Sequence, residues 1–251
     1  MAQRVPLLSP LPRAGRPSLP AAVRQGRIIY ANIRKFIHYL FSCNLSEIVV
    51  MLLASLLGQP LPLLPLQILW LNLVTDVFPA LSLAMEPGEV DIMERPPRSP
   101  DAALLGRRTV RSILGYAVLI AVSALTAFLL GRYVCKHPEP TQMGGVDAAV
   151  TMSFLTIGLG QLFHVFNSRK EHGALKAHEW LSNRYVLGAV VLTVALQLCA
   201  VYLPGLNTVL KTALLDGRDW LIVGVCSLVP MAAGQLSARF MPSGEPGVNA
   251  D

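Results

Sequence analysis

The sequence predicts an all-α membrane protein, a bundle of six transmembrane helices, and three observations support this fold class. The 251 residues are 53% hydrophobic and only 14% charged, with a mean hydropathy of +0.51, far more apolar than a soluble domain. Apolar windows of about 20 residues recur, and at 1.5 Å per residue each matches the ~30 Å hydrocarbon layer of a bilayer. No alternating strand pattern competes with them, and lipid leaves only helices or closed barrels as spanning structures.

The predicted spans follow one another along most of the chain. In order, they cover residues 36–57, 63–85, 113–131, 148–166, 185–203 and 220–240. An even number of spans places both termini on the same side of the membrane. We therefore expect one membrane domain over residues 21–245, surrounded by membrane lipid and preceded by a separate tail.

The expected tail, residues 1–20, is rich in Pro and Arg and has no apolar core of the length that a signal peptide needs. Its composition gives it little to bury in a folded structure. We expect a disordered cytoplasmic tail.

The distribution of Lys and Arg indicates the orientation of the spans. All 21 of these residues lie on one side of the predicted topology except Arg132, Lys136, Lys211 and Arg218. By the positive-inside rule, the side that carries most of them, with both termini, is cytoplasmic. The formal charge of +6 is explained by this bias. Nucleic-acid binding would need basic residues clustered with aromatics or a known motif, so no nucleic-acid partner is expected.

The four cysteines (Cys43, Cys135, Cys199 and Cys226) are scattered along the chain. They have no CxxC spacing and no histidines at metal-ligand intervals, which argues against a zinc site or a disulfide framework. We interpret them as small packing residues.

The first two spans are joined by the short segment "GQPLP", residues 58–62, which predicts a tight antiparallel hairpin. Glu47 and Asp76 are the only acidic residues well inside any span, and they lie one on each arm of this hairpin. A charged side chain at the bilayer centre costs roughly 2.5–3.5 kcal/mol even on the more lenient insertion scales, and such groups usually have a function.

Amide and hydroxyl side chains accompany both carboxylates. Asn44 lies three residues before Glu47, and Asn72, Thr75 and Asp76 have the spacing i, i+3 and i+4, so each set shares a helix face. This is a ligand set of oxygen atoms with a formal charge of −2. It suits a hard cation such as Ca²⁺, because no histidine or thiolate among the five favours a softer metal.

Pro79 gives a mechanical reason for an ion site on the second span. Proline cannot donate a hydrogen bond to the carbonyl of Thr75, four residues earlier, and its ring crowds that turn. Carbonyls freed at membrane depth are tolerated where protein, a cavity or a bound ion satisfies them. A structural alternative stays open, because intramembrane Asn and Thr often join helices by hydrogen bonds and a buried carboxyl can pack in its protonated form.

The fourth span offers a sixth candidate ligand, Gln161, whose amide oxygen could complete the coordination shell. His164 follows one turn later and is expected to be an interfacial residue near the cytoplasmic boundary rather than a functional group.

Three blocks of the sequence closely resemble the C-terminal membrane half of P-type cation-transporting ATPases, above all the calcium-pump branch. The blocks are "GRIIYANIRKFIHYLFSCNLSEIVV", "PLPLLPLQILWLNLVTDVFPALSLAMEP" and "DIMERPPRSP". The resemblance runs from about residue 21 to the last span. It implies that the six spans correspond to the last six of the family's ten membrane helices.

The resemblance also implies which residues bind the ion. The family's ligands match Asn44, Glu47, Asn72, Thr75 and Asp76. Calcium pumps with two ion sites have a glutamate at the position of Gln161, so this difference implies fewer calcium ions per cycle. Val77 replaces a glycine that usually follows the aspartate, which makes the backbone beside Asp76 less free to unwind.

The sequence contains no Asp-Lys-Thr-Gly phosphorylation motif, and the family's cytoplasmic domains and first four helices have no counterpart in it. We therefore expect a truncated or split pump that neither hydrolyses ATP nor transports ions alone. ATP and Mg²⁺ would act only if a partner, the N-terminal half of a pump, supplied the missing part. The alternative is a stand-alone membrane protein, either a passive cation channel or a regulatory partner of an intact pump. By family analogy we expect the membrane to be a bacterial plasma membrane.

Overall fold

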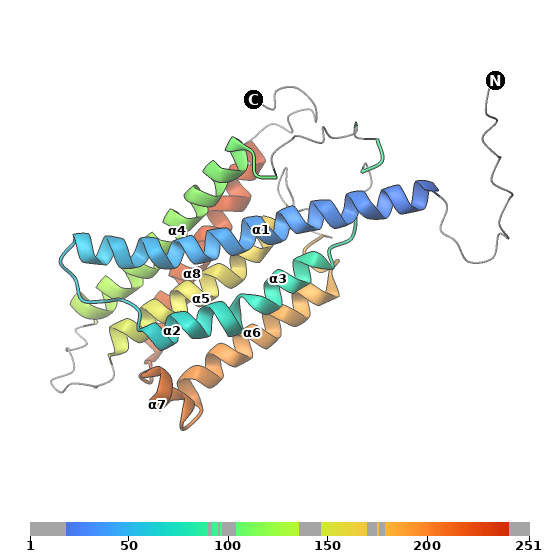
Figure 1. Ribbon diagram of the computed structural model, residues 1–251. Coiled ribbons are helices and arrows are strands. Elements are labelled where there is room, and N and C mark those ends of the chain that lie inside the picture. Colours follow the sequence, from blue (N-terminus) through green and yellow to red (C-terminus); the bar gives the residue numbers. More distant parts are fainter. Residues whose placement is uncertain are drawn as a thin grey trace, which may run out of the picture.

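The computed structural model describes residues 19–89, 92–94, 96, 104–135, 147–169, 175 and 179–240. Over these ranges the chain forms helices joined by short connections (Figure 1), namely α1 (Leu19–Leu56), α2 (Pro65–Trp70), the π-helical turn η1 (Leu71–Thr75), α3 (Val77–Ala84), α4 (Arg107–Tyr133), α5 (Ala148–Ser168), α6 (Arg184–Tyr202), α7 (Leu206–Leu210) and α8 (Gly217–Phe240). Six stretches are long and apolar enough to span a membrane: α1, the α2–η1–α3 unit, α4, α5, α6 and α8. The predicted all-α membrane protein is confirmed.

The start of the first span differs from the prediction. α1 begins at Leu19 instead of residue 36, so the helix extends well beyond the apolar window, and residues 19 and 20 belong to the helix rather than to the tail. Helix formation needs no apolar side chains, so a hydropathy window marks only the part of a helix that lipid can cover. The remainder of the expected tail, residues 1–18, lies outside the described residues, as do residues 241–245 of the expected domain.

The turn after α1 explains why the first two spans form a hairpin. Gly58 has a φ of 64°, its N–H donates to Ser55 O at 3.0 Å, and the N–H of Gln59 donates to Ala54 O at 2.9 Å. This pair of hydrogen bonds is a Schellman motif, in which glycine readily takes the left-handed conformation. The chain then reverses, and α3 packs against α1. Figure 1 shows the two helices side by side, as the short connection predicts.

α5 is the central helix of the bundle. Nearly all of its residues are buried, and it contacts α1, α3, α4, α6 and α8. Asp147 caps its N-terminus, because the carboxylate accepts hydrogen bonds from the N–H groups of Ala149 and Val150 at 2.8 and 3.4 Å. Side chains on any face of α5 therefore meet another helix.

The buried apolar residues form two clusters along the bundle axis, with a polar layer between them. The first cluster includes Val50, Leu71, Ile157 and Ala200, and the second includes Cys43, Ala80, Val165 and Val186. Each of these two sets takes one residue from each of the same four elements: α1, the α2–η1–α3 unit, α5 and α6. Seven of the buried or half-buried polar residues that lie between the clusters on these helices are called the polar layer: Glu47, Asn72, Thr75, Asp76, Gln161, Thr193 and Gln197.

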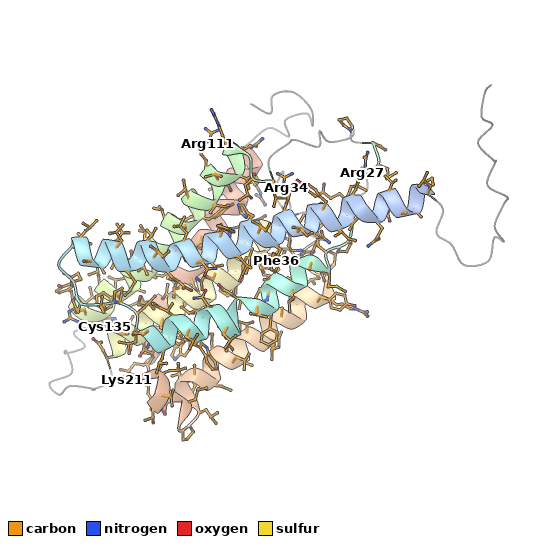
Figure 2. The ribbon with its side chains drawn as sticks, in the orientation of Figure 1. Arg27, Arg34, Phe36, Arg111, Cys135 and Lys211 are labelled. Carbon is orange, nitrogen blue, oxygen red and sulfur yellow. The ribbon has the colours of Figure 1, made fainter. Side chains whose placement is uncertain are left out.

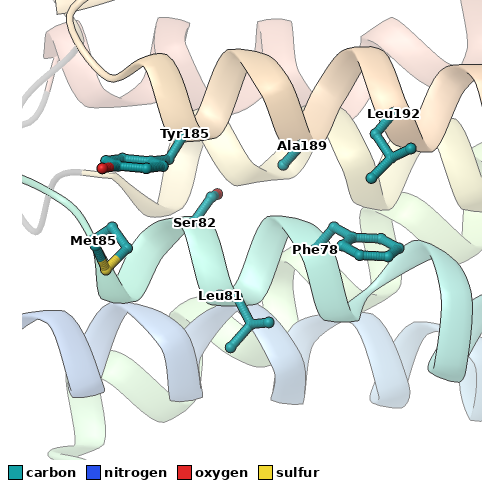
Figure 3. A pocket seen from close by; sticks show the side chains of 7 residues that line it. All are labelled: Phe78, Leu81, Ser82, Met85, Tyr185, Ala189 and Leu192. Carbon is teal, nitrogen blue, oxygen red and sulfur yellow. The ribbon is translucent and has the colours of Figure 1, made fainter.

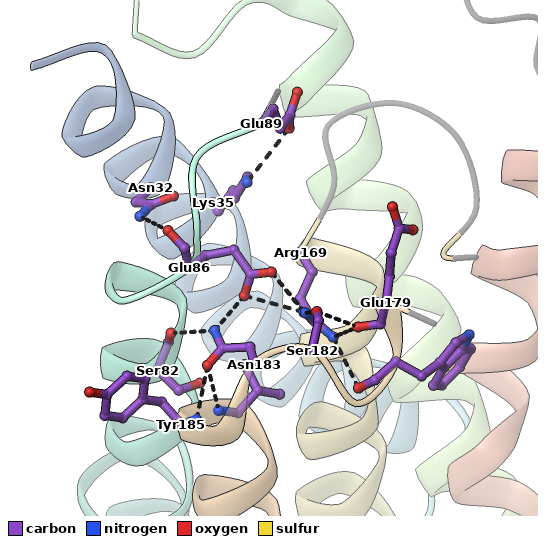
Figure 4. Close-up of polar contacts among 12 residues, drawn as sticks. Asn32, Lys35, Ser82, Glu86, Glu89, Arg169, Glu179, Ser182, Asn183 and Tyr185 are labelled. Atoms are coloured by element: carbon purple, nitrogen blue, oxygen red, sulfur yellow. Dashed lines mark hydrogen bonds and ion pairs between the residues drawn. The ribbon is translucent and has the colours of Figure 1, made fainter. Parts of the chain in front are cut away.

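A hydrogen-bonded network fixes the end of α3 to three other helices (Figure 4). Arg169, only 1% exposed, donates to both carboxylate oxygens of Glu86, with its shortest contact at 2.9 Å. Asn183 donates to the same carboxylate at 2.6 Å, and Asn32 of α1 donates to the backbone carbonyl of Glu86 at 2.8 Å. Glu86 therefore ties the segment after α3 to α1, α5 and α6.

The charged ends of the bundle are well separated. Figure 2 shows Arg27, Arg34 and Arg111 at one end and Cys135 and Lys211 at the opposite end. The polar network around Glu86 lies at the arginine-rich end, because it includes Asn32 of α1 and the end of α3. The two ends thus differ in their basic residues, as the topology predicted from sequence requires.

Candidate cation site

Glu47 is the centre of the polar layer. Its carboxylate accepts a hydrogen bond from Asn72 Nδ2 at 2.6 Å on one oxygen and from Gln161 Nε2 at 3.2 Å on the other. Three elements, α1, η1 and α5, thereby meet at one buried carboxylate. The structure thus brings together three of the residues that the sequence proposes as ligands.

Asp76 lies beside this group and is 1% exposed. Within the described part of the chain, neither of its carboxylate oxygens has a hydrogen-bond partner, and neither Asp76 nor Glu47 has a Lys or Arg in an ion pair. The hydroxyl of Tyr39 and the thiol of Cys43 are neighbours of this carboxylate, but neither meets the geometry of a hydrogen bond to it. Two carboxylates thus share one buried space without an opposing charge from the described residues.

The α2–η1–α3 unit changes its helical geometry at the site. The N–H of Asp76 donates to Leu71 O at 2.9 Å, five residues earlier, and this π-helical turn precedes Pro79. Single π-helical turns inside α-helices are frequently found at functional sites. The hydroxyl of Thr75 donates to the same Leu71 carbonyl at 2.7 Å, so Thr75 stabilises the turn. The predicted break in the helix is confirmed, and it takes the form of a wide turn.

Asn44 is not brought into the site. It is exposed, and its Nδ2 donates to Leu40 O of its own helix at 2.8 Å. On α1 the buried stripe runs through Cys43, Glu47 and Val50, whereas Asn44 shares an exposed face with Phe41 and Ile48. Positions three apart on a helix differ by about 60° in direction, so the edge of the buried stripe passes between Asn44 and Glu47.

His164 is completely buried inside the bundle, so its side chain faces neighbouring helices rather than the outside of the bundle. Its Nε2 lies 3.3 Å from Ser168 Oγ, and its ring centroid is 4.2 Å from that of Tyr116 on α4. A histidine near the end of an apolar window can face either lipid headgroups or neighbouring helices. Because α5 is the central helix, the side chain of His164 faces neighbouring helices.

The sequence interpretation missed two polar residues of the layer, Thr193 and Gln197 on α6. Both are buried, and neither the hydroxyl of Thr193 nor the amide of Gln197 has a hydrogen-bond partner among the described residues. Because they are four residues apart, the sequence alone places them on one face of α6. It does not indicate which helix that face contacts, so neither residue could be assigned to the site.

Two surface grooves of the bundle are separate from this site. The groove in Figure 3 lies between α3 and α6 and has a volume of about 220 Å³. Its walls are mostly apolar and include Phe78, Leu81 and Leu192, which are exposed on the outside of the bundle. A second groove of about 240 Å³ is formed by α6 and the residue that follows it. Neither groove reaches a carboxylate of the polar layer.

Comparison with known proteins identifies the family of the chain. The family described as "Cation transporting ATPase, C-terminus" matches residues 60–240. The chain is 39% identical over 224 residues to the calcium-transporting ATPase of Bacillus subtilis (strain 168), an alignment that covers 88% of this chain and 24% of the relative. It is 34% identical over 227 residues to calcium-transporting ATPase 1 of Bacillus cereus (strain ATCC 10987 / NRS 248), covering 87% of this chain and 26% of that protein.

The chain spans about a quarter of the length of the curated relatives that it matches. The family match covers more than half of the chain and includes five of the six stretches that can span a membrane. The protein is an integral, multi-pass membrane protein, and it belongs to the P-type cation-transporting ATPases, of which it represents the C-terminal transmembrane region.

Proposed function

We propose that this chain is the membrane-embedded ion-binding part of an ATP-driven calcium pump, and that Glu47, Asn72, Thr75, Asp76 and Gln161 bind the transported Ca²⁺. The relatives named above are calcium-transporting ATPases, which supports calcium as the ion. The ion would pass through the polar layer, since this layer lies between the two apolar clusters.

One observation carries the proposal: three buried oxygen atoms of the polar layer, both Oδ atoms of Asp76 and Oε1 of Gln161, have no hydrogen-bond partners among the described residues. Buried acceptors without a partner are rare, because each costs about 1–3 kcal/mol. A hard cation satisfies such oxygens and neutralises the two carboxylates at the same time. Neutral amide and hydroxyl oxygens complete the ligand set. Such a set of oxygen atoms binds calcium in preference to softer metals.

The exposed position of Asn44 is consistent with a further part of the pump. Its face of α1 carries Phe41, Ile48 and Leu52, all more than half exposed. We propose that helices from the N-terminal half of a pump cover this face and turn Asn44 into a ligand. That half would also bind ATP and Mg²⁺, so these 251 residues alone bind the ion without hydrolysing ATP. The membrane would be a bacterial plasma membrane, with the arginine-rich end in the cytoplasm.

The first test measures Ca²⁺ binding by the purified chain in lipid nanodiscs, using radioactive calcium. We expect saturable binding that Asp76→Asn abolishes, because the substitution removes half of the formal charge. Asp219→Asn is the matched control, since Asp219 is equally buried but lies at the start of α8, far along the chain from the layer. Calcium binding that survives Asp76→Asn would contradict the ligand assignment.

A second test distinguishes a pump part from a channel. In one arm, residues 21–245 replace the corresponding region of the Bacillus subtilis relative, and calcium-stimulated ATP hydrolysis is measured. In the other arm, the chain alone is reconstituted in liposomes and Ca²⁺ flux is followed without ATP. We expect hydrolysis in the first arm and no flux in the second. Flux without ATP would instead favour a passive cation channel.

A further inference from the structure

The buried face of α6 carries two polar side chains that are not among the proposed calcium ligands. Gln197 is 1% exposed and Thr193 is fully buried, yet the Nε2 and Oε1 atoms of Gln197 and the Oγ1 atom of Thr193 all lack hydrogen-bond partners among the described residues. Three unpaired polar atoms on one face of a membrane helix are costly unless something binds to them.

The amide of Gln197 packs against Gly158 of α5, where no side chain blocks it. A methyl group at Gly158 would overlap Nε2 of Gln197 and would lie 3.0 Å from Cδ2 of Leu71, the first residue of the π-helical turn. Glycine at this position therefore lets the amide of Gln197 enter between α5 and η1. Gln161 lies one turn further along α5, and Thr75 lies one turn further along η1.

Thr193 lies on the same level as those ligands. α6 runs antiparallel to the α2–η1–α3 unit, so the residue one turn before Gln197 is opposite the end of the π-helical turn. The apolar residues on either side agree with this register, because Val186 belongs to one apolar cluster and Ala200 to the other. α6 is thus a fourth wall of the polar layer.

The atoms offered by this wall are suited to a water molecule rather than to a bare cation. They comprise one amide donor, one amide acceptor and one hydroxyl, with no charge. A buried water needs two to four such partners. Calcium takes six to eight oxygen ligands, commonly including water, and the two carboxylates and their neighbouring amides leave part of that shell to be filled.

We propose that Gln197 and Thr193 bind a water molecule that completes the coordination shell of the transported cation, so that Gln197 is a positioning residue for ion binding. The inference rests on the proposed calcium site. Gln197 acts through the water, and its amide also holds the water against the π-helical turn.

The test compares Gln197→Met with Gln67→Met in the full chain in lipid nanodiscs, by calcium affinity and by thermal unfolding without calcium. Gln67 is a matched control: it is also fully buried, but its amide donates to Leu210 O at 3.0 Å and accepts from Leu64 N at 3.0 Å. We expect Gln197→Met to weaken calcium binding about tenfold, equivalent to about 1.4 kcal/mol, without lowering the unfolding temperature. Gln67→Met should lower the unfolding temperature and leave affinity nearly unchanged. Gln197→Glu, which keeps an acceptor at the same reach, should retain binding.

The outcomes separate this inference from the proposed function. Calcium binding that Gln197→Met leaves unchanged would contradict the role of Gln197 alone. A lower unfolding temperature with unchanged affinity would assign Gln197 a purely structural role and would also overturn the inference. If the unmodified chain binds no calcium, both the proposed function and the inference fail.

Discussion

At the residue scale, the bundle treats its buried charges in two opposite ways. Arg169 and Glu86 form a paired group, in which the guanidinium also donates to the backbone carbonyls of Glu179 and Trp180 at 2.8 and 3.2 Å. The carboxylate of Asp76 has no such partner among the described residues. A paired buried charge fixes structure, whereas an unpaired one is suited to a ligand.

The paired group should contribute strongly to stability. Replacing Arg169 by Met leaves the Glu86 carboxylate without its guanidinium, so we expect a loss of about 3–5 kcal/mol in the free energy of unfolding, measured by denaturation in detergent mixtures. Arg169→Lys should fall between this variant and the wild type, because lysine keeps the charge but cannot form the bidentate contact.

Arg239→Met is the control for this prediction, because Arg239 is exposed in the last turn of α8. Its effect should stay within about 0.5 kcal/mol. Equal effects of the Arg169 and Arg239 substitutions would show that the network around Glu86 does not stabilise the bundle.

The sequence predicted individual site residues to different extents. Glu47, Asn72 and Gln161 meet as expected because large polar groups inside apolar spans must turn away from lipid. The exposure of Asn44 could not be predicted, since the width of the buried stripe on α1 depends on which helices pack against it. Gln197 was missed because it is an isolated amide in an apolar window. The Arg169–Glu86 pair was missed because both residues lie beside the ends of spans, where charges ordinarily face solvent.

At the element scale, the helices are positioned by small residues at their crossings. Gly131 near the end of α4 shows this, because a methyl group there would lie 2.6 Å from Met152 Sδ and 3.2 Å from the Cα of Ala149. The second contact is to backbone, which cannot move aside as a flexible side chain does. The close approach of α4 to α5 therefore depends on glycine at this position.

We expect Gly131→Ala to destabilise the bundle by about 1–3 kcal/mol through overpacking, seen as a lower thermal unfolding temperature in nanodiscs. Gly188→Ala on α6 is a matched control, because no atom lies within 4 Å of the added methyl group. Since glycine inside a helix is less favourable than alanine by roughly 0.5–1 kcal/mol, this control should be neutral or slightly stabilising. The same response in both variants would mean that helix propensity, not packing, determines the effect.

The membrane spans themselves were the most predictable part of the fold, because a sustained apolar window is enough to indicate each of them. Their ends were less predictable. α1 extends to Leu19 without an apolar sequence there, and residues of this extension are held by tertiary contacts, such as Arg27, which donates to Ile92 O at 2.9 Å. The π-helical geometry of η1 was only partly foreseen: Pro79 predicts an interruption but does not specify its form.

At the scale of the whole molecule, the bundle is layered along its axis, with apolar clusters on both sides of a thin polar layer. This arrangement places the carboxylates far from both ends of the bundle, where an ion bound to them would be shielded from water. The ends differ in charge, so under the positive-inside rule we expect the arginine-rich end to face the cytoplasm.

The orientation can be tested with cysteine labelling. In a variant that lacks Cys43, Cys199 and Cys226, we expect a membrane-impermeant maleimide applied outside intact bacterial cells to react with Cys135, which lies just after the end of α4. A second variant, with Arg111→Cys as its only thiol, should react only after the cells are permeabilised. The reverse pattern would place the arginine-rich end outside.

The Schellman turn at Gly58 has a consequence for how the protein enters its membrane. Because it reverses the chain directly after α1, Glu47 and its partner Asn72 are only 25 residues apart in sequence. Contacts this local can form while the chain is still being synthesised, before α5 and α6 have left the ribosome. The first two spans can therefore insert as one unit whose most costly side chain already has a hydrogen-bond partner, and the helices made later need only close around it.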